Sequence, residues 1–144
     1  MLDLDRQICF PLYAATRAVT RRYAEVLADV GLTYPQYLVM LALWTDGPLS
    51  VGDLGRRLRL DSGTLTPLVK RLEAAGRVER RRDPHDERRV VVTPTAEGER
   101  LRDDVAEVPR EVARSIGMTT DEFVQLHHLL SGLIENLDAT GQQP

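Results

Sequence analysis

The chain has 144 residues, of which 42% are hydrophobic and 28% are charged, enough for one domain with a buried core and too few for two independent domains. Its longest apolar run, residues 37–44, is far shorter than the ~20 residues of a membrane span, and no early segment has the pattern of a signal peptide. We therefore expect a cytoplasmic protein with no membrane partner. The formal net charge of −3 argues against nucleic-acid binding only if the charge is evenly spread.

The charge is concentrated in the middle of the chain. Residues 56–89 contain eleven Lys or Arg and six Asp or Glu, a net charge of +5, so the remaining residues together carry −8. A basic segment between acidic arms is compatible with a local contact to an anionic partner such as DNA.

The first predicted element is a long helix from Ile8 to Val30, because its apolar positions recur at alternating steps of three and four residues. Pro11 places the start nearby, since proline is tolerated only in the first turn of a helix. Cys9 therefore lies in or just before that turn. It is the only cysteine, so it is either an inert packing residue or a reactive thiol.

Three further helices are predicted from their capping residues. Thr33 and Gln36 form a capping box that opens a buried helix reaching about Thr45. Ser50 caps a short helix that ends near residue 60, and Asp61 opens another helix that runs to Gly76.

The pattern then changes to two short extended segments, 77–82 and 88–93, joined by a charged turn at residues 83–87. Thr95 caps a helix that Pro109 is expected to kink, and a last helix begins at about Thr119. Both helices carry an apolar side.

This order predicts a mainly α protein with a small β-hairpin wing, a winged helix-turn-helix that dimerises through its N- and C-terminal helices. We take residues 1–144 as a single winged-helix domain. Within it, residues 1–31 and 95–144 are expected to be dimerisation helices, and residues 32–94 the DNA-binding core. We expect no catalytic residues, no metal and no cofactor.

The helix after Asp61 has two faces. Its leucines and Val69 gather on one side and are expected to pack, whereas Thr64, Thr66, Lys70 and Arg71 cover the other side. Small hydroxyl residues at the start of a recognition helix allow close approach to the major groove of DNA. The alternative for this helix alone is an ordinary solvated polar face.

The hairpin carries a second basic surface, because five arginines surround its acidic tip. Such a strand pair suits insertion beside a phosphate backbone or into a narrow minor groove. Asp86 is positioned to hold Arg88 in one conformation through hydrogen bonds. The alternative is a solvated hairpin whose charges pair only among themselves.

With these elements in place, the sequence resembles the MarR family over nearly its whole length. Within that family it is most similar to the organic hydroperoxide regulators with one cysteine, because Tyr13 and Tyr23 accompany Cys9. The segments that carry the wider resemblance are Leu32–Leu38, Leu60–Leu68, Lys70–Glu73, Asp86–Arg88 and Thr95–Gly98.

The resemblance implies a homodimer that binds an inverted-repeat operator in double-stranded DNA, with each recognition helix in the major groove and each wing in the minor groove. It also implies that Cys9 reacts with organic hydroperoxides and that Tyr13 and Tyr23 hydrogen-bond its sulfur. The positions that match the DNA-facing residues of the family are Ser62, Thr64, Thr66, Lys70, Arg71, Asp86 and Arg88.

Helix geometry adds to this picture of the sensor. A cysteine in the first turn faces free backbone N–H groups that favour its thiolate, and Tyr13 lies on the same helix face. Tyr23 is fourteen residues further on, ~21 Å along the helix, so only a partner chain that crosses antiparallel near Thr16 brings it to Cys9. The two Cys9 sulfurs would then be too far apart for a disulfide, so we expect a sulfenic acid and then a mixed disulfide with a low-molecular-weight thiol.

Three other functions remain open from the sequence. The first is a repressor of the same fold that responds to a small aromatic or phenolic ligand, with Cys9 incidental. The second is a thiol peroxidase, although no acid-base cluster or second cysteine accompanies Cys9. The third is a dimerisation module with no nucleic-acid partner.

Overall fold

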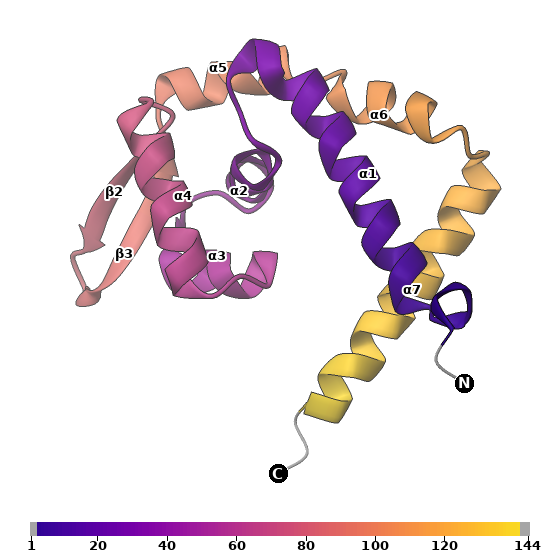
Figure 1. Ribbon diagram of the computed structural model, residues 1–144. Coiled ribbons are helices and arrows are strands. Elements are labelled where there is room, and N and C mark those ends of the chain that lie inside the picture. The colour runs from indigo at the N-terminus through magenta and orange to yellow at the C-terminus, as the bar shows by residue number, and fades with distance from the viewer. Residues whose placement is uncertain (1–2, 142–144) are drawn as a thin grey trace. The chain divides into compact units, whose positions relative to one another are not determined.

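The computed structural model describes residues 3–141, which form helices and one small antiparallel sheet (Figure 1). The contacts group these residues into one unit that ends at Val112 and a second that begins at Ala113, and each is described by itself. The elements of the first unit are η1 (Leu4–Arg6), α1 (Cys9–Leu27), η2 (Ala28–Val30), α2 (Tyr34–Asp46), β1 (Leu49–Ser50), α3 (Val51–Leu58), α4 (Ser62–Ala74), β2 (Val78–Asp83), β3 (Asp86–Pro94) and α5 (Ala96–Asp104). Helix α6 (Val108–Ile116) spans the boundary, and α7 (Thr120–Gly141) lies in the second unit.

The winged helix-turn-helix architecture and the predicted helix starts are confirmed. Thr33 accepts a hydrogen bond from the Gln36 N–H, and the Gln36 side chain accepts one from the Thr33 N–H, which completes the capping box of α2. The side chains of Ser50, Asp61 and Thr95 cap α3, α4 and α5, each by accepting a hydrogen bond from the backbone N–H three residues later. Each cap satisfies a backbone N–H that the helix itself leaves without a partner.

The sheet has the strand order β1-β3-β2 and contains a strand that the sequence did not indicate. Strand β1 is only two residues long, too short for an alternating pattern, and pairs Leu49 with Val92 and Ser50 with Val91. The hairpin turn is also tighter than the predicted 83–87 loop, because Asp83 pairs with Asp86 and only residues 84 and 85 lie between the strands.

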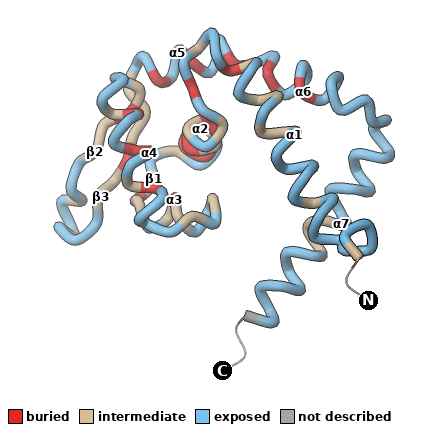
Figure 2. Tube along the Cα trace, viewed as in Figure 1, coloured by how far each residue is buried: buried red, intermediate tan, exposed pale blue. Residues whose placement is uncertain are grey.

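The core of the first unit surrounds α2, whose Val39, Met40 and Leu43 are almost completely buried. Figure 2 shows buried positions in α2 and α5, whereas most of α1 is exposed. In the described part of the chain no single helix is long and apolar enough to cross a membrane. Among these described residues, one pair of segments, Cys9–Val30 and Tyr34–Asp46, would be long and apolar enough if taken together, but a bend of 74° separates them.

A glycine allows α5 to lie directly against the backbone that leads into β2. A Cβ atom on Gly98 would be 2.0 Å from the Arg77 carbonyl oxygen, so a larger residue would displace the backbone there. The Gly98 carbonyl in turn accepts a hydrogen bond of 3.1 Å from the indole N–H of Trp44 on α2. Helix α5 is thereby fixed to α2 and to the segment that precedes β2.

The predicted kink at Pro109 is a complete break. Helix α5 ends at Asp104 and α6 starts at Val108, so Pro109 occupies the first turn of a new helix, where its missing N–H costs no hydrogen bond. The predicted apolar side is correct, because Leu101, Val105, Val108 and Val112 are all buried.

In the second unit, α7 begins as predicted after Thr119, whose hydroxyl accepts a hydrogen bond from the Glu122 N–H. None of residues 113–140 is buried, so the apolar side chains of α7 form no core among the described residues of that unit. The large hydrophobic residues exposed on α7 are Phe123, Val124, Leu126, Leu129, Leu133, Ile134 and Leu137.

Candidate DNA interface and thiol site

The two faces predicted for α4 are present. Leu65, Leu68, Val69 and Leu72 are buried, which fixes the rotation of the helix about its axis. The opposite side of α4 therefore faces solvent. Of the predicted DNA-facing residues, Ser62, Thr64, Lys70 and Arg71 are exposed, and Thr66 is half-buried.

The first turn of α4 has both a cap and free hydroxyl groups. Asp61 accepts a hydrogen bond of 2.7 Å from the Thr64 N–H, so the backbone here is held in helical geometry. The side chains of Ser62 and Thr64 remain exposed beside it. This arrangement suits close approach to the edges of bases, because small side chains keep the backbone near the groove.

The predicted contact between Asp86 and Arg88 is confirmed. The Oδ1 atom of Asp86 accepts hydrogen bonds of 3.1 Å from both the backbone N–H and the Nε–H of Arg88. These bonds lower the pKa of the Asp86 carboxyl group below its ordinary value. The Arg88 side chain is nevertheless 91% exposed, so its guanidinium group is available to a phosphate or a groove.

The remaining wing arginines differ in what they contact. Arg81 pairs with Glu79 at 3.0 Å on the same strand, and the Arg81 side chain is largely exposed, whereas Glu79 is half-buried. Arg82 donates a hydrogen bond of 3.0 Å to the backbone carbonyl of Glu87, which leaves its charge uncompensated by that contact. Sequence reasoning placed these arginines around the tip but did not separate them by role.

Arg80 faces the recognition helix instead of solvent. Its Nε and NH2 atoms both lie 2.8 Å from Oε2 of Glu73, and its backbone N–H donates to Oε1 of the same carboxylate. The Arg80 hydrogen bonds lower the pKa of Glu73. Arg80 therefore holds β2 against α4 and is not part of the exposed basic surface.

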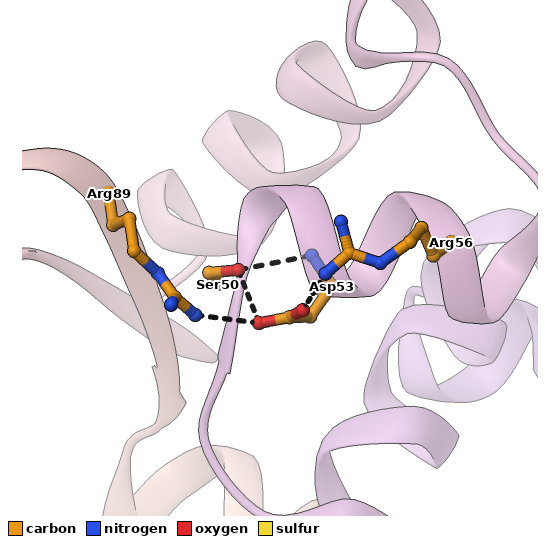
Figure 3. Close-up of polar contacts among 4 residues, drawn as sticks. All are labelled: Ser50, Asp53, Arg56 and Arg89. Carbon is orange, nitrogen blue, oxygen red and sulfur yellow. Dashed lines mark hydrogen bonds and ion pairs between the residues drawn. The ribbon is translucent and has the colours of Figure 1, made fainter.

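A similar contact joins the other strand of the wing to α3 (Figure 3). Oδ2 of Asp53 accepts from the Ser50 hydroxyl at 2.5 Å and from Arg89 at 2.9 Å, while Oδ1 pairs with Arg56. The Ser50 hydrogen bond, followed by the charges of Arg56 and Arg89, lowers the pKa of Asp53. No local pattern in the sequence predicted this contact, because Asp53 and Arg89 lie 36 residues apart along the chain.

Cys9 is the first residue of α1, as the position of Pro11 predicted. The structure adds that this cysteine is exposed. Tyr13 is also exposed, and its hydroxyl accepts a hydrogen bond of 2.8 Å from Arg17, whose guanidinium group lies over the Tyr13 ring. The phenol proton of Tyr13 is not used by that bond. A hydrogen bond from Tyr13 to the Cys9 sulfur stays a prediction.

Tyr23 belongs to a tyrosine cluster that the sequence did not reveal. Its ring centroid lies 4.5 Å from that of Tyr34 and 5.8 Å from that of Tyr37, so the three rings join α1 to the start of α2. Burial raises the pKa of all three phenols, that of Tyr37 to about 12. The cluster therefore keeps its hydroxyl groups protonated, which is the form that donates hydrogen bonds.

The two sites have different chemistry. The α4 face and the wing present exposed small hydroxyl groups and basic side chains, an arrangement that fits DNA. The start of α1 presents a thiol. Among residues 3–141, no group of three or more His, Cys, Asp or Glu side chains is placed to hold a metal ion.

Comparison with known proteins places these observations in context. Residues 32–90 match the MarR family. The HTH-type transcriptional regulator TtmR of Methylorubrum extorquens is 49% identical over 95% of this chain and 70% of that protein. The organic hydroperoxide resistance transcriptional regulator of Bacillus subtilis is 38% identical over 94% of this chain and 92% of that protein.

A solved structure described as reduced AbfR bound to DNA is also similar, and AbfR is a protein of Staphylococcus epidermidis. It shares 36% sequence identity with this chain and superposes with a TM-score of 0.78. The match covers 93% of this chain and 94% of that one.

Proposed function

The chain belongs to the MarR family of DNA-binding transcriptional regulators, and from this premise we propose that it is a homodimeric repressor that releases its operator when an organic hydroperoxide oxidises Cys9. The observation that carries the proposal is the exposed position of this sole cysteine at the first residue of α1. As a member of a family of regulators, the chain is not an enzyme.

The DNA-binding part of the proposal rests on α4 and the wing. Ser62, Thr64 and Thr66 are the candidate contacts to base edges, since they lie in the first turns of α4. The basic residues Lys70, Arg71 and Arg88 are candidates for phosphate or minor-groove contacts, with Asp86 holding Arg88 in place. Two such surfaces related by a two-fold axis would match an inverted repeat.

The dimer is supported by apolar surface on the first and last long helices, each taken by itself. Ile8 at the start of α1 is 68% exposed, and Leu129 on α7 is 69% exposed. A single chain that stays alone in water seldom leaves so many large apolar side chains uncovered. We propose that a second copy of this chain covers the apolar surface of both helices.

The proposed chemistry begins with the Cys9 thiolate. Its sulfur attacks the terminal oxygen of the hydroperoxide, the O–O bond breaks, and the organic fragment leaves as an alkoxide that takes up a proton to become an alcohol. Sulfur loses two electrons and becomes a sulfenic acid. A low-molecular-weight thiol then attacks this sulfur, so that water leaves and a mixed disulfide remains.

The site around Cys9 is proposed to be shared between two chains. Tyr13 lies one turn from Cys9 on the same helix, while Tyr23 is held in the tyrosine cluster. In an antiparallel crossing near Thr16, Tyr23 of one chain would face Cys9 of the other. A bulky group on Cys9 would separate the helices there and alter the spacing of the two recognition helices.

The proposal is tested with the variant Cys9→Ser. We expect this variant to dimerise and to bind DNA from upstream of its own coding sequence as the wild type does, but to keep that DNA after treatment with an organic hydroperoxide. Mass spectrometry of the treated wild type should find the added oxygen or thiol on Cys9. Met118→Leu is a matched control, because among residues 3–141 Met118 carries the other exposed sulfur.

Two outcomes would overturn the assignment. Release of DNA by the treated serine variant would place the sensor elsewhere in the chain. Release that follows only from adding an aromatic or phenolic compound, with Cys9 unmodified, would support a ligand-responsive repressor.

A further inference from the structure

The wing contains a short irregular segment of β3 that has no pairing partner in β2. The pairing of β2 with β3 passes from Arg82–Val90 directly to Asp83–Asp86, so residues 87–89 have no partner residue in β2. This irregular segment contains Arg88, whose side chain is almost fully exposed. The placement of residues 87–89 therefore depends on contacts other than the backbone pairing of β2 with β3.

Asp53 supplies the contact between this segment and the helix-turn-helix. The pairing of β1 with β3 ends at Ser50–Val91, and the next point of attachment toward the tip is the bond of 2.9 Å from Arg89 to Asp53. Ser50 links the two contacts, because it pairs with β3 through its backbone and donates its hydroxyl proton to Asp53.

The bond from Arg80 to Glu73 does not replace this contact. Arg80 pairs with Val92, which lies further from the tip than Arg89, and it fixes β2 and not β3. Figure 3 shows that Asp53 receives Arg89 from the wing on one side and Arg56 from α3 on the other. The carboxylate is thus the junction between α3 and the irregular part of β3.

We propose that Asp53 is a positioning residue for DNA binding: by holding Arg89 it fixes the irregular segment 87–89 against α3 and so presents Arg88 to DNA. Arg89 then serves the structure of the wing, while the neighbouring Arg88 contacts the nucleic acid. The inference rests on the proposed DNA-binding surface and is independent of peroxide sensing.

The direction in which Asp53→Asn changes the affinity for DNA distinguishes this positioning role from a purely electrostatic one. Asp53→Asn removes a negative charge near a surface that binds a polyanion, so charge alone predicts tighter binding to DNA. A positioning role predicts weaker binding, because an amide holds two guanidinium groups poorly. The two explanations therefore differ in direction and not only in size.

The experiment measures the affinity of the full-length protein for two duplexes, DNA from upstream of its own coding sequence and a random sequence of equal length. We expect Asp53→Asn to weaken binding to the upstream DNA by about fivefold. Glu79→Gln is the matched control, because it removes the same charge from an ion pair within β2. That control should bind at least as tightly as the wild type.

A double-variant cycle identifies Arg89 as the residue through which Asp53 acts. Arg89→Gln should weaken binding about as much as Asp53→Asn, and the double variant should be no weaker than either single one. Arg89→Lys should recover part of the loss. Hydrogen exchange at the amides of residues 87–89 should become faster in Asp53→Asn and stay unchanged in Glu79→Gln, a local effect that general destabilisation would not produce.

Tighter or unchanged binding of folded Asp53→Asn would overturn the proposal, as would additive losses in the cycle. If Asp53→Asn does not fold, Arg89→Gln and Arg89→Lys decide the question, since equal losses of affinity with unchanged exchange at residues 87–89 would contradict it. A wild type that binds neither duplex would instead refute the DNA-binding surface itself. The response of Cys9 to peroxide is expected to be the same in every variant of this series.

Discussion

The DNA-facing surface and the thiol end of α1 differ in how much of their geometry a single chain provides. Leu65 and Val69 anchor α4 in the core, and two acid-arginine contacts fix the wing to α3 and α4. By contrast, Cys9 and the residues near it lie on an exposed stretch of helix. The proposed recognition surface is therefore complete within one chain, whereas the proposed sensor would need a second molecule to enclose it.

The tyrosine cluster lies between these two regions. Tyr23 belongs to the same helix as Cys9, while Tyr37 is only 2% exposed and belongs to the core that supports α4. A displacement of α1 at Cys9 would therefore act on the packing of α2. This contact gives the proposed sensor a physical connection to the DNA-binding core.

The largest effect is expected at the wing. Arg88→Ala should weaken binding to upstream DNA by about tenfold and reduce the dependence of log affinity on log salt by about one unit, because one phosphate or groove contact is lost. Thr64→Ala should instead reduce the preference for upstream over random DNA, with little change in that salt dependence. Arg100→Ala, an exposed arginine on α5, is the matched control for loss of charge.

The comparison of Arg88→Ala with Arg100→Ala tests whether the wing contacts DNA. Equal affinity and equal salt dependence in Arg88→Ala and Arg100→Ala would show that the wing makes no special contact with DNA.

A smaller effect is expected from the tyrosine cluster at high pH. Burial, with smaller contributions from Tyr23 and Tyr34, raises the pKa of Tyr37 from 10.0 to about 12, so the folded protein retains this proton over a range where the unfolded chain has lost it. The contribution to stability is complete below pH 10 and is lost as the pH rises toward 12. The unfolding free energy should fall there by about 1.4 kcal/mol per pH unit because of this one phenol.

Urea unfolding between pH 9 and pH 12 measures this slope, with Tyr37→Phe as the comparison. The variant should lose part of the slope. A slope that does not differ from that of the wild type would indicate that Tyr37 ionises in the folded core without penalty.

The smallest effect is expected at Tyr23, and it sharpens the claim that the sensor is shared. In a mixed dimer with Cys9→Ser in one subunit and Tyr23→Phe in the other, the surviving cysteine still faces an intact tyrosine if the helices cross antiparallel. With both changes in the same subunit, it faces phenylalanine, which donates no hydrogen bond, and its oxidation should be about threefold slower.

The rate of sulfenic acid formation on Cys9 is the measurement, and the two mixed dimers carry the same substitutions, so differences in stability largely cancel. Equal rates would reject the crossing near Thr16, and with it the reason for excluding a disulfide between two Cys9 residues.

Local features of the fold were predictable because the interactions that create them are local. The caps at Thr33, Ser50 and Thr95 each join residues three positions apart, and the buried side of α4 follows from helical periodicity. The same reasoning gave the contact between Asp86 and Arg88, which are two residues apart.

Other features had no local signal. Strand β1 is too short for periodicity, and the split between α5 and α6 required knowing that the chain turns at residues 105–107 before Pro109. The sequence grouped Arg80 and Arg89 with the other basic residues around the tip of the wing, yet each is held by a carboxylate on a different helix. The tyrosine cluster likewise joins residues that only the packing of α1 on α2 brings together.

The sequence by itself determined where the helices start, which side of α4 is buried, and that one cysteine lies at the start of α1, because capping and periodicity act over a few residues. Only the tertiary structure decided which wing arginines pair with carboxylates on α3 and α4 and which extend into solvent. The reason is that an ion pair such as Asp53–Arg89 spans 36 residues of chain and forms only when the sheet has already placed β3 beside α3.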